Sequence, residues 1–177
     1  MWELYAFWSL SASFLAATPA SREGRFPIAV SFAAFLTIGA GVLGSWFAGW
    51  MSRTMGERRV AVVALAASGA FCCLSWALFS LPFWILMPAV LVWGFFVVAD
   101  SAQFSALAAR TCPAEYTGTA LTIQNGIGFA VTVVAIPFTA WMAQLLGWRW
   151  AFVFLAAGPL LGILSLVRLK GAAGRTG

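Results

Sequence analysis

Long apolar runs separated by short polar breaks make up almost the whole chain. A helix needs about 20 apolar residues to cross the hydrocarbon core of a bilayer. Six runs approach or exceed that length: 2–19, 27–51, 59–80, 83–108, 118–144 and 149–169. The pattern predicts an all-α integral membrane protein whose six transmembrane helices form one bundle over residues 1–170. The Gly- and Ala-rich residues 171–177 are predicted to form a disordered tail.

The composition agrees with a membrane protein and excludes a soluble domain. Of the 177 residues, 63% are hydrophobic and only 8% are charged, whereas a soluble domain carries about 25% charged residues. The net charge of +5 comes from basic residues in the short breaks, where such residues determine membrane topology. We therefore expect the lipid bilayer, and not nucleic acid, to be their partner. Glu3 stands where a signal peptide would carry positive charge, so the first run is predicted to be a genuine membrane helix.

Basic residues are distributed unevenly between the two sides of the predicted bundle. The second and fourth breaks and the C-terminal end hold seven of them: Arg53, Arg58, Arg59, Arg110, Arg168, Lys170 and Arg175. The remaining breaks hold three: Arg22, Arg25 and Arg149. Because the cytoplasmic side of a membrane protein is enriched in Lys and Arg, both termini and the tail are predicted to be cytoplasmic. The expected location of this multi-pass protein is the plasma (inner) membrane of a bacterium.

The reactive side chains do not form any familiar catalytic set. The chain has no histidine and three cysteines, of which Cys72 and Cys73 lie within an apolar run. Zinc and haem sites and Ser–His catalysis depend on residues that are missing here. We expect no metal, no cofactor and no enzymatic activity.

Asp100 is the acidic residue that lies most deeply within an apolar run. A carboxylate at the bilayer centre costs roughly 2.5–3.5 kcal/mol, and about 15 Å of helix separates Asp100 from Arg110. Gln103 lies one turn away, and Gln124 and Asn125 lie at comparable depth in the next run. One interpretation is a water-filled pathway in which Asp100 carries a proton or cation and the amides bind a solute. The other is a structural clamp, because polar side chains also hold membrane helices together.

The six runs differ in polarity, which suggests two units of three helices. The third and sixth runs contain nothing more polar than serine apart from basic residues at their ends, and they are predicted to face lipid. A weak sequence echo agrees, since Gly56-Glu57-Arg58 opens the third run and Gly147-Trp148-Arg149 opens the sixth. Repeated units are typical of secondary transporters. Small residues of the second run are predicted to permit close packing; they are Gly39, Gly41, Gly44, Ala48 and Gly49.

The break between the second and third runs carries a recognisable motif. From Gly49 to Arg59 it reads Gly-Trp-Met-Ser-Arg-Thr-Met-Gly-Glu-Arg-Arg. This resembles the loop signature of the major facilitator superfamily of transporters, Gly-x-Leu-x-Asp-Arg-x-Gly-Arg-Arg. The residues of this loop motif are Gly49, Ser52, Arg53, Gly56, Arg58 and Arg59. Arg53 stands where the family has aspartate, a departure typical of the motif copy in the second half of these transporters.

The resemblance extends over essentially the whole chain and implies a fold and a function. Residues 2–8 resemble the opening of the family's seventh helix, and residues 147–152 resemble the start of its last helix. The implied fold is the C-terminal six-helix half of a major facilitator bundle, built from two three-helix repeats. In the family the first and fourth helices of each half line the cavity. Tyr5 and Trp8 therefore join Asp100 and its neighbouring amides as candidates for the substrate or proton pathway.

The implied function is secondary active transport of a small solute, and Asp100 makes proton coupling a further expectation. Alternating access needs two bundles that move against each other. The expected partner is therefore an N-terminal six-helix half or a second copy of this chain. Two alternatives remain open, a non-transporting membrane accessory or assembly protein and an inactive transporter fragment.

Overall fold

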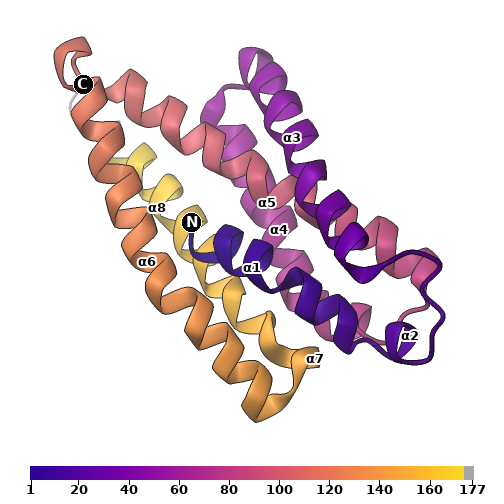
Figure 1. Ribbon diagram of the computed structural model, residues 1–177. Helices are drawn as coiled ribbons and strands as arrows, with labels where there is room; N and C mark the ends of the chain where they lie inside the picture. The colour runs from indigo at the N-terminus through magenta and orange to yellow at the C-terminus, as the bar shows by residue number, and fades with distance from the viewer. Residues whose placement is uncertain (174–177) are drawn as a thin grey trace.

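The protein is a bundle of long antiparallel helices (Figure 1). The computed structural model describes residues 1–173, with the side chains of residues 1–168. In chain order the elements are α1 (Trp2–Ala17), α2 (Pro19–Arg22), α3 (Val30–Met55), α4 (Glu57–Leu78), α5 (Phe83–Thr111), the 3₁₀ turn η1 (Ala114–Tyr116), α6 (Thr117–Leu146), α7 (Trp148–Ala151), the 3₁₀ turn η2 (Val153–Ala156) and α8 (Ala157–Ala173). Residues 1–173 contain no strand.

Five segments are long and apolar enough to cross a membrane, which bears out the integral membrane fold. They are Val30–Met55, Glu57–Leu78, Phe83–Thr111, Ala114–Leu146 and Trp148–Arg168. Helix α1 has only 16 residues, or about 24 Å of helix, because the chain turns into α2 at Thr18 and Pro19. A hydrocarbon core is about 30 Å thick. The expected count of six spans is therefore not confirmed.

The last apolar run differs from the single helix predicted over 149–169. It consists of α7, η2 and α8 in succession. Pro159 is the third residue of α8, and proline is tolerated in the first turn of a helix. Its position is therefore compatible with a new helix that starts at Ala157. The tail predicted over 171–177 starts within α8, which extends to Ala173; residues 174–177 lie outside the described part of the chain.

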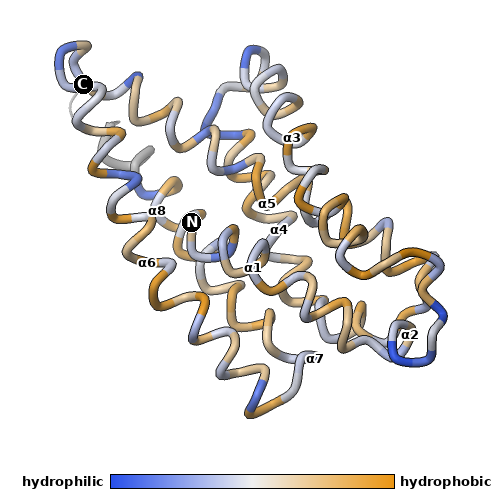
Figure 2. Tube along the Cα trace, viewed as in Figure 1, coloured by the Kyte–Doolittle hydropathy of each residue, from blue (hydrophilic) through white to orange (hydrophobic). Residues whose placement is uncertain are grey.

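Polar residues gather at the two ends of the bundle, and the middle of each long helix is mainly apolar (Figure 2). The Gly56 end contains the α3–α4 and α5–α6 turns. The Gly147 end contains the α1–α2 corner and the α4–α5 and α6–α7 turns. Both Gly56 and Gly147 adopt positive φ, of 81° and 83°, a conformation that glycine adopts without steric cost. Gly56 separates α3 from α4, and Gly147 separates α6 from the short helix α7.

Helices α3 and α5 approach each other so closely that their backbones touch. A Cβ atom built on Gly44 would overlap the carbonyl oxygen of Phe95, and one on Gly94 would overlap that of Thr37. Contacts of this kind are a main source of helix association in membranes, because lipid is as apolar as the helices themselves. The predicted packing role of Gly44 is thus confirmed, whereas a Cβ on Gly39 would meet nothing within 4 Å.

The core centres on aromatic side chains from three segments. Phe7 of α1 lies 4.5 Å from Trp93 of α5 between ring centroids, and Phe14 lies 5.2 Å from Phe152. Trp93 and Phe152 are fully buried and meet edge to face at 5.5 Å. Tilted and edge-to-face rings add to the stability that burial alone provides. This cluster fixes α1 against α5 and against the start of the last helical segment.

The exposed apolar surface extends beyond the two runs that were expected to face lipid. On the third and sixth runs the exposed apolar side chains include Val63, Leu74, Leu160 and Leu164, while one side of α4 is buried against α5 and α8. Large exposed apolar side chains also cover α3 and α6, among them Phe35, Trp46, Ile127 and Val133. The absence of strongly polar residues from α4 reflects helix packing as well as exposure to lipid.

We predict that Gly44→Ala destabilises the bundle while Gly39→Ala does not. The added methyl group at position 44 meets backbone atoms that cannot rotate away, and overpacking of this kind costs about 1–3 kcal/mol. Thermal unfolding of the detergent-purified chain, followed by circular dichroism, measures the difference. Equal unfolding midpoints for the two variants would contradict the close approach at Gly44.

Candidate functional site

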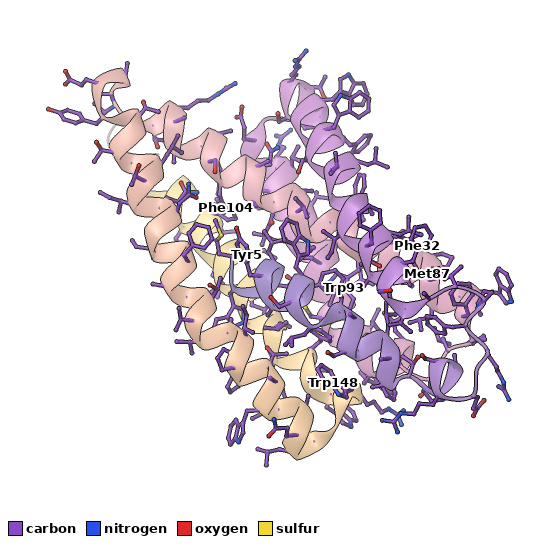
Figure 3. The ribbon with its side chains drawn as sticks, viewed as in Figure 1. Tyr5, Phe32, Met87, Trp93, Phe104 and Trp148 are labelled. Atoms are coloured by element: carbon purple, nitrogen blue, oxygen red, sulfur yellow. The ribbon has the colours of Figure 1, made fainter. Side chains whose placement is uncertain are left out.

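A buried carboxylate joins three helices near the start of α1. Glu3 is 6% exposed. The indole Nε1 of Trp93 on α5 donates to Glu3 Oε1 at 2.9 Å, and Ser68 Oγ on α4 donates to Glu3 Oε2 at 3.1 Å. A charged or polar group removed from water is stable only with such partners. Trp93 lies close beside α1 in Figure 3.

Asp100 shares a cavity with Glu3. The cavity has a volume of about 190 Å³ and lies between the first residues of α1, α4, α5 and α8. Glu3 and Asp100 are the acidic side chains in its lining, and Phe104, Leu65 and Pro159 supply apolar walls. Within residues 1–168, neither carboxylate lies within ion-pair distance of a lysine or arginine. Met1 also lines the cavity, and its amino group interacts electrostatically with both acids. The site thus brings two carboxyl groups together, where a proton can be held.

The other predicted members of the polar group lie in different environments. Gln103 is 2% exposed, and its Oε1 has no hydrogen-bond partner in the described part of the chain. Gln124 on α6 is half-buried and Asn125 is exposed. No hydrogen bond among the described side chains joins these amides to Asp100. Asp100, Gln103, Gln124 and Asn125 lie at similar depths along their helices, but they do not form one connected network.

Tyr5 and Trp8 lie between α1 and α6. Their rings meet edge to face at 5.8 Å, and Tyr5 also approaches Phe129 of α6 at 5.3 Å. Figure 3 shows Tyr5 on the α6 side of α1, with Phe104 nearer the Gly56 end. Trp8 Nε1 is buried without a hydrogen-bond partner among the described residues. Both side chains thus lie near the carboxylate site but outside the lining of its cavity.

Two residues of the Gly49–Arg59 segment tie the α3–α4 turn to other helices. Glu57 pairs with Arg110 at the end of α5 at 2.8 Å. A terminal nitrogen of Arg58 donates to the carbonyl oxygens of Leu166 and Val167 in α8. Cations near a helix C-terminus also interact favourably with its dipole. The segment is therefore part of the tertiary structure.

The remaining members of the loop motif make local contacts. Ser52 Oγ donates to the carbonyl oxygen of Gly49 at 2.9 Å, and Gly56 supplies the positive φ of the turn. Arg53 and Arg59 are exposed. The two exposed arginines are available to the membrane surface, whereas Arg58 is used within the fold.

Comparison with known proteins places this arrangement in a family. The profile of the Major Facilitator Superfamily matches residues 4–175, which is nearly the whole chain. The chain belongs to the Major Facilitator Superfamily. This confirms the resemblance to the family, which is a family of transporters. Substrate and coupling ion do not follow from the family match.

One curated relative is similar over a short segment. The chain is 41% identical over 59 residues to a protein of Pseudomonas aeruginosa described as "Transcription regulatory protein OpdE". The match covers 33% of this chain and 15% of that protein, so the chain spans well under two thirds of this relative's length. No solved structure gives a significant match.

Glu3 is the functional candidate that sequence reasoning missed. Its position near the start of the first apolar run indicated only that this run is not a signal peptide. Its partners Ser68 and Trp93 are 65 and 90 positions away, so no local pattern connects them. The available signal was the cost of any carboxylate within an apolar run, which applies to Glu3 as it does to Asp100.

We predict that Glu3→Ala lowers stability more than Glu3→Gln does. Alanine leaves Trp93 Nε1 and Ser68 Oγ without their acceptor, a loss of about 1–3 kcal/mol for buried groups, whereas glutamine keeps one acceptor oxygen. Thermal unfolding in detergent measures both variants, with Glu115→Gln in the exposed η1 turn as the control for loss of a negative charge. Unfolding of Glu3→Ala at the parent's midpoint would contradict the bridging role.

Proposed function

We propose that the chain acts in secondary active transport of a small solute, as the C-terminal six-helix half of a Major Facilitator transporter. The observation that carries this proposal is the family match over residues 4–175, combined with two carboxylates that line a cavity inside the helical bundle. The transporter would be completed by an N-terminal six-helix half or by a second copy, because alternating access needs two bundles.

The burial pattern supports two three-helix repeats within this half. Gly56 and Gly147 lie 91 positions apart, and the same shift relates the buried faces of the helices. The structure describes six buried positions between 148 and 168, and each of them matches a buried position of α4 under this shift. In order, positions 151, 152, 155, 156, 159 and 166 correspond to positions 60, 61, 64, 65, 68 and 75. Four of the six buried positions of α6 match α3 in the same way: 128, 132, 135 and 139 match 37, 41, 44 and 48.

A pair of arginines supports the same repeat. Arg58, at the start of α4, donates to the Val167 carbonyl at 3.3 Å, and Arg149, 91 positions later, donates through Nε to the Trp76 carbonyl at 3.2 Å. Val167 is likewise 91 positions after Trp76. Each arginine therefore stands at the start of one helical segment and binds the far part of the other. A two-fold relation between two inverted units accounts for this reciprocity.

We assign proton coupling to the Glu3–Asp100 cavity. A buried carboxylate is stable when protonated or paired. Glu3 has hydrogen-bond donors from two other helices, whereas Asp100 forms no ion pair within residues 1–168 and has only the amino group of Met1 as a positive charge in its vicinity. Asp100 is thus the better candidate to exchange a proton during transport, and Glu3 the better candidate to position α1 against α4 and α5.

We predict that Asp100→Asn abolishes proton-coupled uptake without reducing membrane insertion or yield. Asparagine keeps the size and polarity of the side chain but cannot carry a proton. The chain is co-reconstituted with its partner half in proteoliposomes, and a pH-sensitive dye in the lumen reports proton movement when members of a panel of small solutes are added. Glu115→Gln serves as the matched control.

Two results would count against the proposal. Unchanged proton-coupled uptake by Asp100→Asn removes that residue from the coupling step. Co-purification of the parent chain with another membrane complex, together with no movement of any solute in the panel, favours an accessory role or an inactive fragment.

We further propose that the Gly56 end and the C-terminal end of α8 are cytoplasmic, in a bacterial inner membrane. The expectation of a cytoplasmic N-terminus is not part of this proposal, because Met1 lines the Glu3–Asp100 cavity inside the bundle. The excess of basic residues at that end supports this orientation. In a chain with Cys72, Cys73 and Cys112 replaced by alanine, Ser80→Cys at the Gly147 end should react with an impermeant maleimide on intact cells. Thr54→Cys at the Gly56 end should react only after permeabilisation, because it faces the cytoplasm. The reverse labelling pattern would invert the proposed topology.

A further inference from the structure

Three arginines lie at the Gly147 end of the bundle. The positive-inside rule does not account for them, because it concerns basic residues on the cytoplasmic side. One of them, Arg25, pairs with Glu23 at 2.9 Å. The other two, Arg22 and Arg149, make no ion pair within residues 1–168. Although they are 127 positions apart in the chain, they line the same hollow. Two arginines without ion pairs, from separate turns, thus line one hollow.

The hollow has a charged rim and an apolar floor. Its volume is about 580 Å³, and it lies between the α1–α2 corner and the α6–α7 turn. Ala17, Phe79 and Ala143 supply apolar surface, while Arg22, Glu23 and Arg149 supply charge. Since Glu23 is already paired with Arg25, the rim presents a net positive charge. This combination suits an amphiphile whose polar part is an anion.

Arg149 is held in place for such a contact. Its Nε donates to the carbonyl oxygen of Trp76 at 3.2 Å, and its guanidinium carbon lies 5.6 Å from the centre of the Trp76 ring. Trp76 is in turn stacked on Trp150, with centroids 5.8 Å apart and planes at 10°. The terminal nitrogens of Arg149 have no partner among the described residues. A guanidinium orientated in this way matches the oxygens of a phosphate group.

The α1–α2 corner orders the chain around Arg22 as well. Thr18 is fully buried, and its hydroxyl donates to the Leu15 carbonyl at 2.7 Å and accepts from the Ser21 backbone at 3.4 Å. The Arg25 backbone N–H donates to the Ala20 carbonyl at 2.9 Å. Arg22 lies inside this hydrogen-bonded corner, so its approach to the hollow is built into the local fold.

Tryptophans place the hollow at the depth of lipid headgroups. Trp148 lines it, and Trp76 and Trp150 flank Arg149; Figure 3 shows Trp148 at the Gly147 end of the bundle. Tryptophan concentrates at the boundary between hydrocarbon and water. The two arginines therefore meet the membrane at the level where phosphate groups lie.

We propose that this hollow binds the phosphate group of an anionic phospholipid between Arg22 and Arg149. The first methylene groups of the lipid's acyl chains pack against Phe79 and Ala143. Guanidinium groups bind phosphate oxygens through charge-assisted hydrogen bonds, and the pairing of Glu23 with Arg25 leaves no unpaired acid in the rim to receive the ammonium group of a zwitterionic lipid. The site is independent of any transport activity, because no residue of the Glu3–Asp100 cavity belongs to it.

Native mass spectrometry of the purified full chain tests the proposal with two lipids of identical acyl chains, phosphatidylglycerol and phosphatidylcholine. The parent chain should prefer phosphatidylglycerol. Arg22→Gln should weaken that binding about fivefold, the effect of one basic residue at a membrane surface, and should leave phosphatidylcholine binding unchanged. Arg22→Lys should retain most of the preference. Arg53→Gln is the matched control, since it removes an exposed arginine at the Gly56 end.

A second variant, measured together with a check of folding, tests whether the loss of binding results from a change in structure. Arg149→Gln should lower phosphatidylglycerol binding to a similar degree, and near-UV circular dichroism checks that the Trp76–Trp150 stack remains. The proposal is overturned by equal weakening in Arg53→Gln, which would indicate attraction to net charge alone. It is also overturned by equal binding of the two lipids to the parent chain, or by complete displacement of phosphatidylglycerol by excess inorganic phosphate, which would indicate a site for the free anion.

Discussion

The direct contact between the backbones of α3 and α5 is the constraint on which the other helices depend. In a bilayer, apolar surface does not drive helices together, so their association relies on close packing and hydrogen bonds. Gly44 and Gly94 remove the side chains that would keep the two helices apart. Once α5 is fixed, Trp93 and Asp100 project from it towards α1 and α4. The carboxylate site is thus a consequence of where two glycines allow a helix to lie.

Sequence pattern predicted the long helices well because apolar length and breaks at Gly, Pro and charge are local properties. It was less accurate where a tertiary or steric effect decided the outcome. The last run is divided into α7, η2 and α8, and α1 ends at a buried Thr18 cap; composition reveals neither boundary. Likewise, the glycine-rich second run indicated close packing, but not that Gly44 makes the contact and Gly39 makes none.

The polar site was only partly predictable for a related reason. Counting residues from a helix end gives the depth of Asp100, but it does not give the side of the helix on which a neighbour lies. Asn125 has a similar depth and is nevertheless exposed, whereas Glu3 comes from the other end of the chain and lines the same cavity as Asp100. The loop motif, in contrast, was recognisable because the family repeats it as a contiguous stretch. Motifs that are continuous in sequence identify the family, and sites assembled from several helices require coordinates.

The reciprocal contacts of Arg58 and Arg149 have a consequence for biosynthesis. Chains emerge from the ribosome N-terminal part first, so Arg58 and α4 are made long before their partners at Leu166, Val167 and Arg149. Neither contact can form until the last helical segment has been synthesised and inserted beside α4. Two contacts at opposite membrane surfaces therefore depend on the same segment, residues 148–168. Until that segment is inserted, α4 lacks both of its arginine contacts with it, so this part of the bundle cannot reach its final form earlier.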